Sequence, residues 1–497
     1  MAMNIVKTEQ GLVEGLPCGN PCYTSFKGIP YCAPPTGKNR WRAPQPAEHW
    51  DGVRKAYVFG PQCLQFPFPF PRTIDPCHDF DMAQSEDCLT LNIWTPASSQ
   101  DAKLPVMFWI HGGGFVLGGG SDLYYDGEVF CKEHCVFVSI NYRLGVFGFF
   151  NHPELAGEDP ETASGSFGTL DQQAALKWVK GNIAAFGGDP DNITVFGQSA
   201  GAMSVQLMVS SPLSRNLISK AILQSGIGLP SIPLVPAPSI EEARNYGAAF
   251  MKKAGVDSLG ELRNVNSEKI LQLFKEMPSQ LVGVVDGYVL KEDSFISLIK
   301  GHSSDIPYLC GSNEDEGRLP DDENTRENMR QVISQRMGDR AEELLSICGD
   351  NLPNLILLGT FLQSERIFGN AQTKNGRKAP YIYHFTRNVP SYPEFTDLSR
   401  RGSVHSAEVS YVFQTLNRFY RPMTGIDYDL AMKMTAYWAN FAKTGNPNGP
   451  GLPQWKPYTP NAPQFMELGD VVRMIDIEES PSDRLIREYT EEKLFIV

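Results

Sequence analysis

Residues 193–204 read ITVFGQSAGAMS, and this stretch predicts the fold. A strand-favouring apolar run ends at Gly197, Ser199 follows among glycine and alanine, and a helix-permitting run begins at once. G-x-S-x-G between a strand and a helix is typical of a nucleophile elbow, a turn so tight that its serine is strained and its neighbours must be small. We therefore predict that Ser199 is a nucleophile at a helix N-terminus, where the helix dipole favours negative charge.

Further apolar runs bounded by turn residues predict buried strands. They cover residues 104–110, 136–140, 193–196, 221–223, 308–310 and 381–385. Apolar residues at helical spacing predict a helix over 170–183. A capping box at Ser239 and Glu242 predicts a second helix that ends near Gly255, so helices lie between the strands. This alternation predicts an α/β fold with a large, mostly parallel sheet covered on both faces, preceded by a small N-terminal antiparallel sheet. No linker divides the chain, so we expect one domain over residues 1–497, with proline-rich 228–240 as a surface connection.

A serine nucleophile needs hydrogen-bond donors for the oxyanion that forms on attack. The sequence His111-Gly-Gly-Gly follows the apolar run 104–110, and three glycines allow main-chain N–H groups to turn inward together. We predict an oxyanion hole made of the N–H groups of Gly113, Gly114 and Ala200.

The serine also needs a base, and in this arrangement the chain order is serine, acid, histidine. Three histidines follow Ser199. His302 precedes the acidic loop and His384 lies inside a predicted strand, whereas His405 lies in a loop before a helical stretch. We predict that His405 is the base.

The acid lies in the loop 311–317, GSNEDEG, which follows a predicted strand. The carboxyl ends of strands are where α/β sites are built. Three carboxylates, Glu314, Asp315 and Glu316, are available there, and chemistry alone does not choose among them.

These residues resemble the type-B carboxylesterase family of the α/β-hydrolases, which includes p-nitrobenzyl esterases, animal carboxylesterases and cholinesterases. The resemblance covers nearly the whole chain. The ordered motifs that carry it are FKGIPYCAPPTGKNRWRAPQP, SEDCLTLNIWTP, HGGGF, NYRLGVFGF, LDQQAALKWVKGNIAAFGGDPDNITVFGQSAGAMS, GSNEDEG, VHSAE and YWANFAKTGNPN.

The resemblance implies the triad Ser199, Glu316 and His405, and so selects Glu316 as the acid. It also implies an ion pair between Arg42 and Glu86. Cys63 and Cys88 match a disulfide of exported members, whose loop lies at the pocket rim; here that loop contains Cys77 and QFPFPFPR (65–72). Its phenylalanines are expected either to pin an extended loop onto the core or to form an aromatic rim beside the pocket. Two positions depart from the pattern: Gln198 stands where Glu is usual, and Ala202 where many members have glycine.

Charge and composition exclude some classes of binding partner and indicate a location. The formal net charge of −13 disfavours nucleic acids and anionic membranes. The N-terminus lacks a signal-peptide pattern and no apolar run reaches membrane-spanning length, so we expect a cytoplasmic protein with its ten cysteines reduced. The two C-x3-C pairs lack zinc-site spacing, and we expect neither metal nor cofactor. A small-molecule ester is the expected partner of a monomer or weak homo-oligomer.

The expected function is hydrolysis of neutral, fairly apolar short-to-medium chain carboxylic esters through an acyl-enzyme. The alternatives are a thioesterase, amidase or polyester hydrolase, or a catalytically silent adhesion member of the same fold. Fold alone does not prove activity, because adhesion proteins of this fold have lost the nucleophile. In this sequence the nucleophile, acid and base positions are all occupied by residues that suit those roles.

Overall fold

The computed structural model describes residues 3–19, 22–66, 82–158, 165–228, 237–279, 281–316, 322–349, 352–390, 402–419 and 421–495. The expectations for Cys77, for most of QFPFPFPR and for most of 228–240 lie outside these residues. Two compact units make up the chain: residues 1–220 with 237–293, and residues 221–236 with 294–497. The single domain over 1–497 stays a prediction, and each unit is described by itself.

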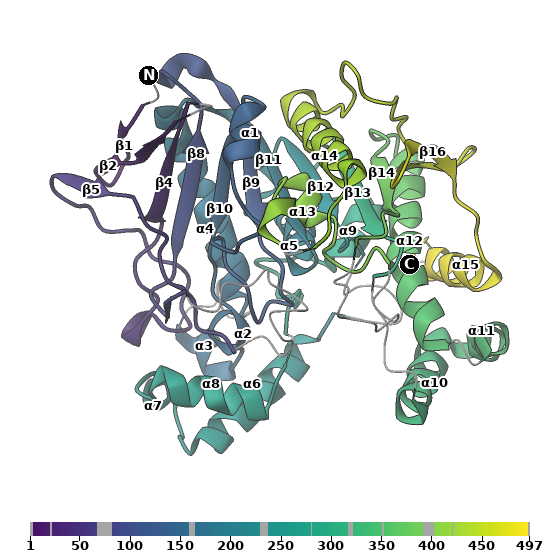
Figure 1. Ribbon diagram of the computed structural model, residues 1–497. Helices are drawn as coiled ribbons and strands as arrows, with labels where there is room; N and C mark the ends of the chain where they lie inside the picture. Colours follow the sequence, from purple (N-terminus) through teal and green to yellow (C-terminus); the bar gives the residue numbers. More distant parts are fainter. Residues whose placement is uncertain are drawn as a thin grey trace. The chain divides into compact units, whose positions relative to one another are not determined.

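The first unit is built on a mixed sheet (Figure 1). Its strands lie in the order β11 (Gly188–Gln198), β9 (Leu104–Ile110), β10 (Val136–Ile140), β8 (Thr90–Thr95), β4 (Tyr23–Pro30) and β3 (Leu16–Cys18). Strand β9 pairs in parallel with both β10 and β11. The pairs β10–β8, β8–β4 and β4–β3 are antiparallel. The small N-terminal sheet consists of β1 (Ile5–Lys7), β2 (Leu12–Glu14) and β5 (Val53–Lys55), and a short pair joins β6 (Gln62–Cys63) to β7 (Gln84–Ser85).

The central strands of this sheet have no polar face. Strands β9 and β10 begin and end at the predicted residues, and every residue of β10 is completely buried. Strands covered on both sides read as continuous apolar runs because neither row of side chains meets water. Trp109 of β9 packs edge-on against Phe196 of β11, with ring centroids 4.8 Å apart. These contacts hold the ends of β9 and β11 side by side.

Helices of the first unit follow the predicted signals. The helix predicted from apolar spacing is α4 (Phe167–Asn182). The capping box is confirmed: Ser239 and Glu242 cap α6 (Ile240–Ala254), which ends at left-handed Gly255. Figure 1 shows α6 together with α7 and α8 beside α2 and α3. The remaining helices of this unit are α1 (Glu128–Lys132), α2 (Gly145–Gly148), α3 (Pro153–Glu158), α5 (Ala200–Ser210), α7 (Leu259–Arg263) and α8 (Ser267–Glu276).

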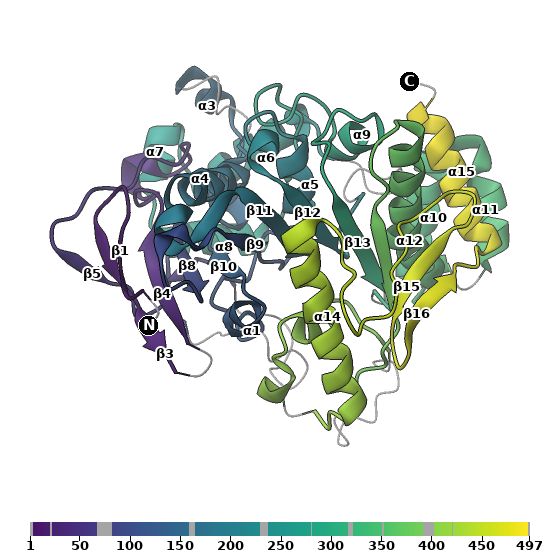
Figure 2. The ribbon, with the colours of Figure 1, turned by 90° about the horizontal axis from the view of Figure 1, so that it is seen from above.

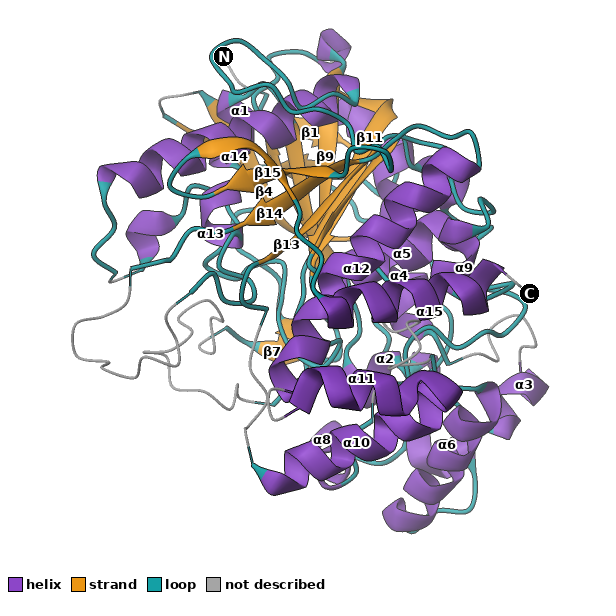
Figure 3. Ribbon diagram, turned by 90° about the vertical axis from the view of Figure 1, so that its right-hand side faces the viewer, coloured by secondary structure: helices purple, strands orange, loops and turns teal. Residues whose placement is uncertain are grey.

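The second unit has a mostly parallel sheet between helices. Strand β12 (Lys220–Gln224), which enters this unit at Ala221, is followed in order by β13 (Tyr308–Asn313), β14 (Tyr381–Phe385), β15 (Gln464–Leu468) and the antiparallel β16 (Val472–Asp476). Figures 2 and 3 show α12 (Leu352–Lys374) and α14 (Gly425–Thr444) on opposite faces of this sheet. The other helices are α9 (Ser294–Ile299), α10 (Glu323–Met337), α11 (Ala341–Cys348), α13 (Val409–Val412) and α15 (Pro481–Phe495).

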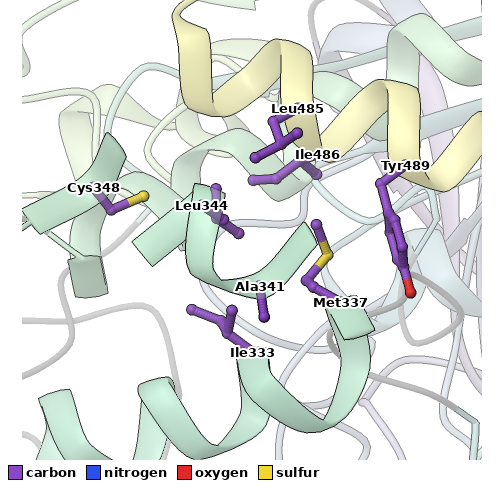
Figure 4. Close-up of a cluster of buried hydrophobic side chains, with 8 residues drawn as sticks. All are labelled: Ile333, Met337, Ala341, Leu344, Cys348, Leu485, Ile486 and Tyr489. Carbon is purple, nitrogen blue, oxygen red and sulfur yellow. The ribbon is translucent and has the colours of Figure 1, made fainter. Parts of the chain in front are cut away.

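A satellite core of the second unit joins helices that are far apart in sequence. Figure 4 shows side chains of α10, α11 and α15 gathered into one buried cluster. Its members are Ile333, Met337, Ala341, Leu344, Cys348, Leu485, Ile486 and Tyr489. The C-terminal helix is thereby fixed to the preceding helices by apolar contact.

The predicted ion pair between Arg42 and Glu86 is wrong, because Arg40 takes the partner. The guanidinium of Arg40 donates two hydrogen bonds of 2.6 Å to Glu86. Arg42 instead bonds to Glu158 at 3.3 Å on a more exposed surface. Trp41, between the two arginines, has a φ of 55°, so the chain turns there and the two side chains take different directions.

Cys63 and Cys88 are free, buried thiols in the structure. A hydrogen bond with Cys63, followed by burial, raises the pKa of Cys88 well above its usual value. The Cys88 thiol therefore stays protonated at neutral pH. Among the residues that the structure describes, no helix combines the length and apolar character needed to cross a bilayer.

Candidate active site

Ser199 lies at a strained turn between β11 and α5. Its φ of 56° and ψ of −125° are outside the regions that serine ordinarily adopts. Strand β11 ends at Gln198 and α5 begins at Ala200, so Ser199 alone makes the turn. The strained strand-to-helix conformation expected of a nucleophile elbow is present.

Steric contact explains the small residues around this serine. A Cβ on Gly201 would lie 2.0 Å from the carbonyl oxygen of Ile110, and one on Gly197 would lie 2.5 Å from the carbonyl carbon of Gly201. No real side chain tolerates such distances. The end of β9 and the first turn of α5 therefore touch through glycine, so positions 197 and 201 on either side of the serine have no room for a side chain.

The glycine loop that follows β9 runs past the same turn. A Cβ on Gly112 would lie 3.3 Å from the Cβ of Ser199. Gly113 and Gly114 have φ values of 103° and 61°, which favour glycine. The amide of Ala200 opens α5, where N–H groups have no acceptor within the helix. The first unit therefore places Ser199 beside the loop that contains Gly113 and Gly114, and directly before Ala200.

The second unit brings a carboxylate and a histidine together. Oε2 of Glu316 lies 2.5 Å from Nδ1 of His405. The side chain of Glu316 is only 1% exposed, whereas that of His405 is 32% exposed. The acid is thus shielded from water while the imidazole remains open to solvent on one side. Since Nδ1 faces a carboxylate, it carries the proton, and Nε2 is the basic nitrogen.

Of the three candidate carboxylates, Glu316 is the one whose side chain contacts Nδ1 of His405 at 2.5 Å. Glu314 is exposed, and Asp315 is half-buried with its main-chain N–H on the carbonyl of Ser403. The second oxygen of Glu316 accepts the main-chain N–H of Asn313 at 2.6 Å. A strand residue thereby fixes the orientation of the carboxylate.

Asn313 also links this pair to a second buried acid, Glu408. Its side-chain Nδ2 donates to Oε2 of Glu408 and to the carbonyl of Val404, both at 2.8 Å. Gln224 donates to the other oxygen of Glu408 at 3.1 Å. Burial, followed by the neighbouring charge of Glu316, raises the pKa of Glu408 to about 6. The loop that carries His405 is therefore held on both sides of the histidine.

Glu365, on α12, is a further buried acid near this cluster. Burial raises the pKa of Glu365 well above its usual range, and Glu316 contributes in the same direction. A neutral Glu365 avoids placing a second charge near Glu316 in a medium of low dielectric constant. Sequence reasoning missed Glu365, Glu408 and Asn313. Only the position of Glu408, three residues after His405 in VHSAE, offered a signal, since that spacing suits one face of a helical turn.

The other histidines considered from the sequence lie elsewhere. His302 is exposed. His384 lies within β14, half-buried, as expected for a histidine of the sheet, and burial lowers its pKa.

Comparison with known proteins identifies the family to which this chain belongs. The sequence profile of the Carboxylesterase family matches residues 2–344 and 323–485. The chain is 34% identical to a fumonisin B1 esterase of Sphingopyxis macrogoltabida, covering 94% of this chain and 85% of that protein. It is 34% identical to a para-nitrobenzyl esterase of Bacillus subtilis, covering 92% and 93%. A solved PNB esterase structure matches with a TM-score of 0.83 at 32% identity, covering 97% of this chain and 99% of that chain.

These matches define an α/β-hydrolase with serine carboxylic ester hydrolase activity, as the sequence predicted. The chain belongs to the Carboxylesterase family. Fold class, family and enzyme class are thus confirmed. The roles of individual residues and the preferred ester are taken up next as proposals.

Proposed function

We propose that the chain hydrolyses neutral, fairly apolar short-to-medium chain esters through an acyl-enzyme on Ser199. His405 is the general base and Glu316 the acid that orients it. The observation that carries this proposal is the contact between Glu316 and Nδ1 of His405, because it leaves Nε2 of a partly exposed imidazole as the basic atom. Such a nitrogen accepts the proton of a serine hydroxyl.

The reaction has two acyl-transfer steps. Oγ of Ser199 attacks the ester carbonyl as His405 takes its proton, and the imidazolium that forms is stabilised by Glu316. The N–H groups of Gly113, Gly114 and Ala200 stabilise the oxyanion, each by about 3–4 kcal/mol of the barrier. His405 then protonates the leaving alcohol. Water, deprotonated by the same imidazole, releases the acid and restores the hydroxyl.

The strained elbow supports Ser199 as the nucleophile. Keeping serine at a φ of 56° costs of the order of 1–3 kcal/mol, and such strain persists where the surrounding structure imposes it. The glycine contacts between β9, β11 and α5 impose it here. The preference for neutral esters rests on the acidic net charge, which repels anionic substrates. A relative named for a para-nitrobenzyl ester is consistent with this class.

Substitution and labelling test the proposal. Ser199→Ala should abolish turnover of p-nitrophenyl butyrate and labelling by a fluorophosphonate, while circular dichroism remains that of the wild type. Ser214→Ala is the matched control, since Ser214 is a buried serine of the same unit whose hydroxyl donates to the carbonyl of Met208. Retained turnover in Ser199→Ala would refute the assignment. A panel of esters varied separately in acyl and alcohol length then measures the preferred chain length.

A further inference from the structure

Gln65 holds both main-chain groups of one glycine. Its side chain is buried, and its Oε1 accepts the N–H of Gly118 at 2.7 Å. Its Nε2 donates to the carbonyl of Gly118 at 3.0 Å and to that of Cys63 at 3.0 Å. One amide therefore satisfies the donor and the acceptor of Gly118 together, as a neighbouring strand would.

Gly118 closes the turn that begins at the predicted oxyanion glycines. The N–H of Leu117 donates to the carbonyl of Gly113 at 3.0 Å. A Cβ on Gly118 would lie 2.7 Å from Nδ1 of His111 and 2.9 Å from the carbonyl oxygen of Gly112. Gly118 thus packs against the start of the loop, and its φ of 100° suits glycine. The position of Gly118 determines how tightly residues 113–118 fold back.

Separate side chains hold the residues that follow. The N–H of Gly119 donates to Asp122 at 3.2 Å, and that of Gly120 donates to Asn141 at 2.8 Å. These contacts secure the far end of the loop. Gln65 is the side chain that secures the junction between this far end and the glycine turn.

We propose that Gln65 is a positioning residue for the oxyanion hole: by holding Gly118 it keeps the N–H groups of Gly113 and Gly114 aimed at the developing oxyanion. The inference rests on the proposed function, since it takes these amides as the oxyanion donors. Such donors act only within a narrow range of distance to the transition-state oxygen, and a displacement of about 1 Å costs roughly a hundredfold in rate. Binding of the ground-state ester is much less sensitive to this geometry.

The test removes the amide and separates transition-state from ground-state binding. Gln65→Met should lower kcat for p-nitrophenyl butyrate about 10- to 100-fold, with KM within threefold of the wild type. Affinity for an aryl trifluoromethyl ketone, which forms an oxyanion adduct with the nucleophile, should fall by the same factor as kcat/KM. Affinity for the corresponding methyl ketone, measured as a competitive inhibitor, should stay within threefold.

Gln173→Met is the matched control. Gln173 is a buried glutamine of α4 that donates to Ser211 and Ser214, so its loss removes a buried amide away from the glycine loop. If Gln65→Met cannot be recovered folded, Gln65→Leu replaces it, because leucine likewise removes both the donor and the acceptor that hold Gly118, and it should show the same separation.

The inference is overturned if the Gln65 variant loses no more kcat than Gln173→Met, or if both ketones weaken equally. A failure of the proposed function gives a different pattern. In that case Ser199→Ala keeps its activity, or the wild type forms no adduct with the trifluoromethyl ketone.

Discussion

Replacing Glu316 by glutamine should leave the fold intact and place the imidazole proton of His405 on the wrong ring nitrogen. In the wild type, one oxygen of Glu316 accepts the N–H of Asn313 at 2.6 Å and the other faces Nδ1 of His405 at 2.5 Å. A glutamine has only one oxygen. Because the buried N–H of Asn313 needs an acceptor, that oxygen turns toward Asn313 and the amide NH2 turns toward His405.

An NH2 group opposite Nδ1 favours the tautomer that carries its proton on Nε2. That tautomer cannot accept the hydroxyl proton of Ser199 in the proposed reaction. Loss of the correct tautomer costs about 10⁴-fold in kcat in a serine triad, which corresponds to about 5 kcal/mol of barrier. The carboxylate that stabilises the imidazolium is lost in the same substitution.

The measurement is kcat for p-nitrophenyl butyrate at pH 7.5 in Glu316→Gln and in Asp315→Asn, with circular dichroism as the test of folding. Asp315 is the matched control, because it is a half-buried acid of the same loop. We expect Asp315→Asn to stay within about threefold of the wild type, since an amide there changes only a partly solvated charge. More than a tenth of wild-type activity in Glu316→Gln, or a larger loss in Asp315→Asn, would refute the reasoning.

Two further predictions concern stability. Arg40→Met should cost about 3 kcal/mol of unfolding free energy in urea, because it removes the charge partner of Glu86, whose side chain is only 11% exposed. Arg42→Met should cost less than about 1 kcal/mol, because its ion pair is exposed, and equal losses would contradict the ion-pair assignment. The second prediction concerns Glu408, whose pKa is raised to about 6, so the fold favours its neutral form. Its contribution is fully present below the unfolded pKa of about 4.5 and is lost as the pH rises through 6, a change of about 2 kcal/mol. Relative to Glu408→Gln, the wild type should therefore lose about 2 kcal/mol of unfolding free energy between pH 4 and pH 7. If the difference in unfolding free energy between the two proteins does not vary with pH, this prediction is wrong.

Local sterics made much of the fold predictable. Strands β9 and β10 were located to the residue because strands buried on both faces need continuous apolar runs, and turn residues bound those runs. The capped helix α6 was predictable because its capping signal lies within four consecutive residues. The Arg42 prediction failed because two arginines on either side of one tryptophan look alike in sequence, and only the turn at Trp41 separates their directions.

The amino-acid sequence alone determined the family, the enzyme class and the elbow around Ser199, because a tight turn dictates small residues at fixed spacing along the chain. Residue chemistry left three carboxylates open, and the family resemblance selected Glu316; only the tertiary structure showed its contact with His405, a residue 89 positions away. It alone also revealed Glu408 beside that pair and Gln65 on Gly118. Such contacts depend on which side chains the sheets bring together and seal from water, and no local pattern of residues encodes that.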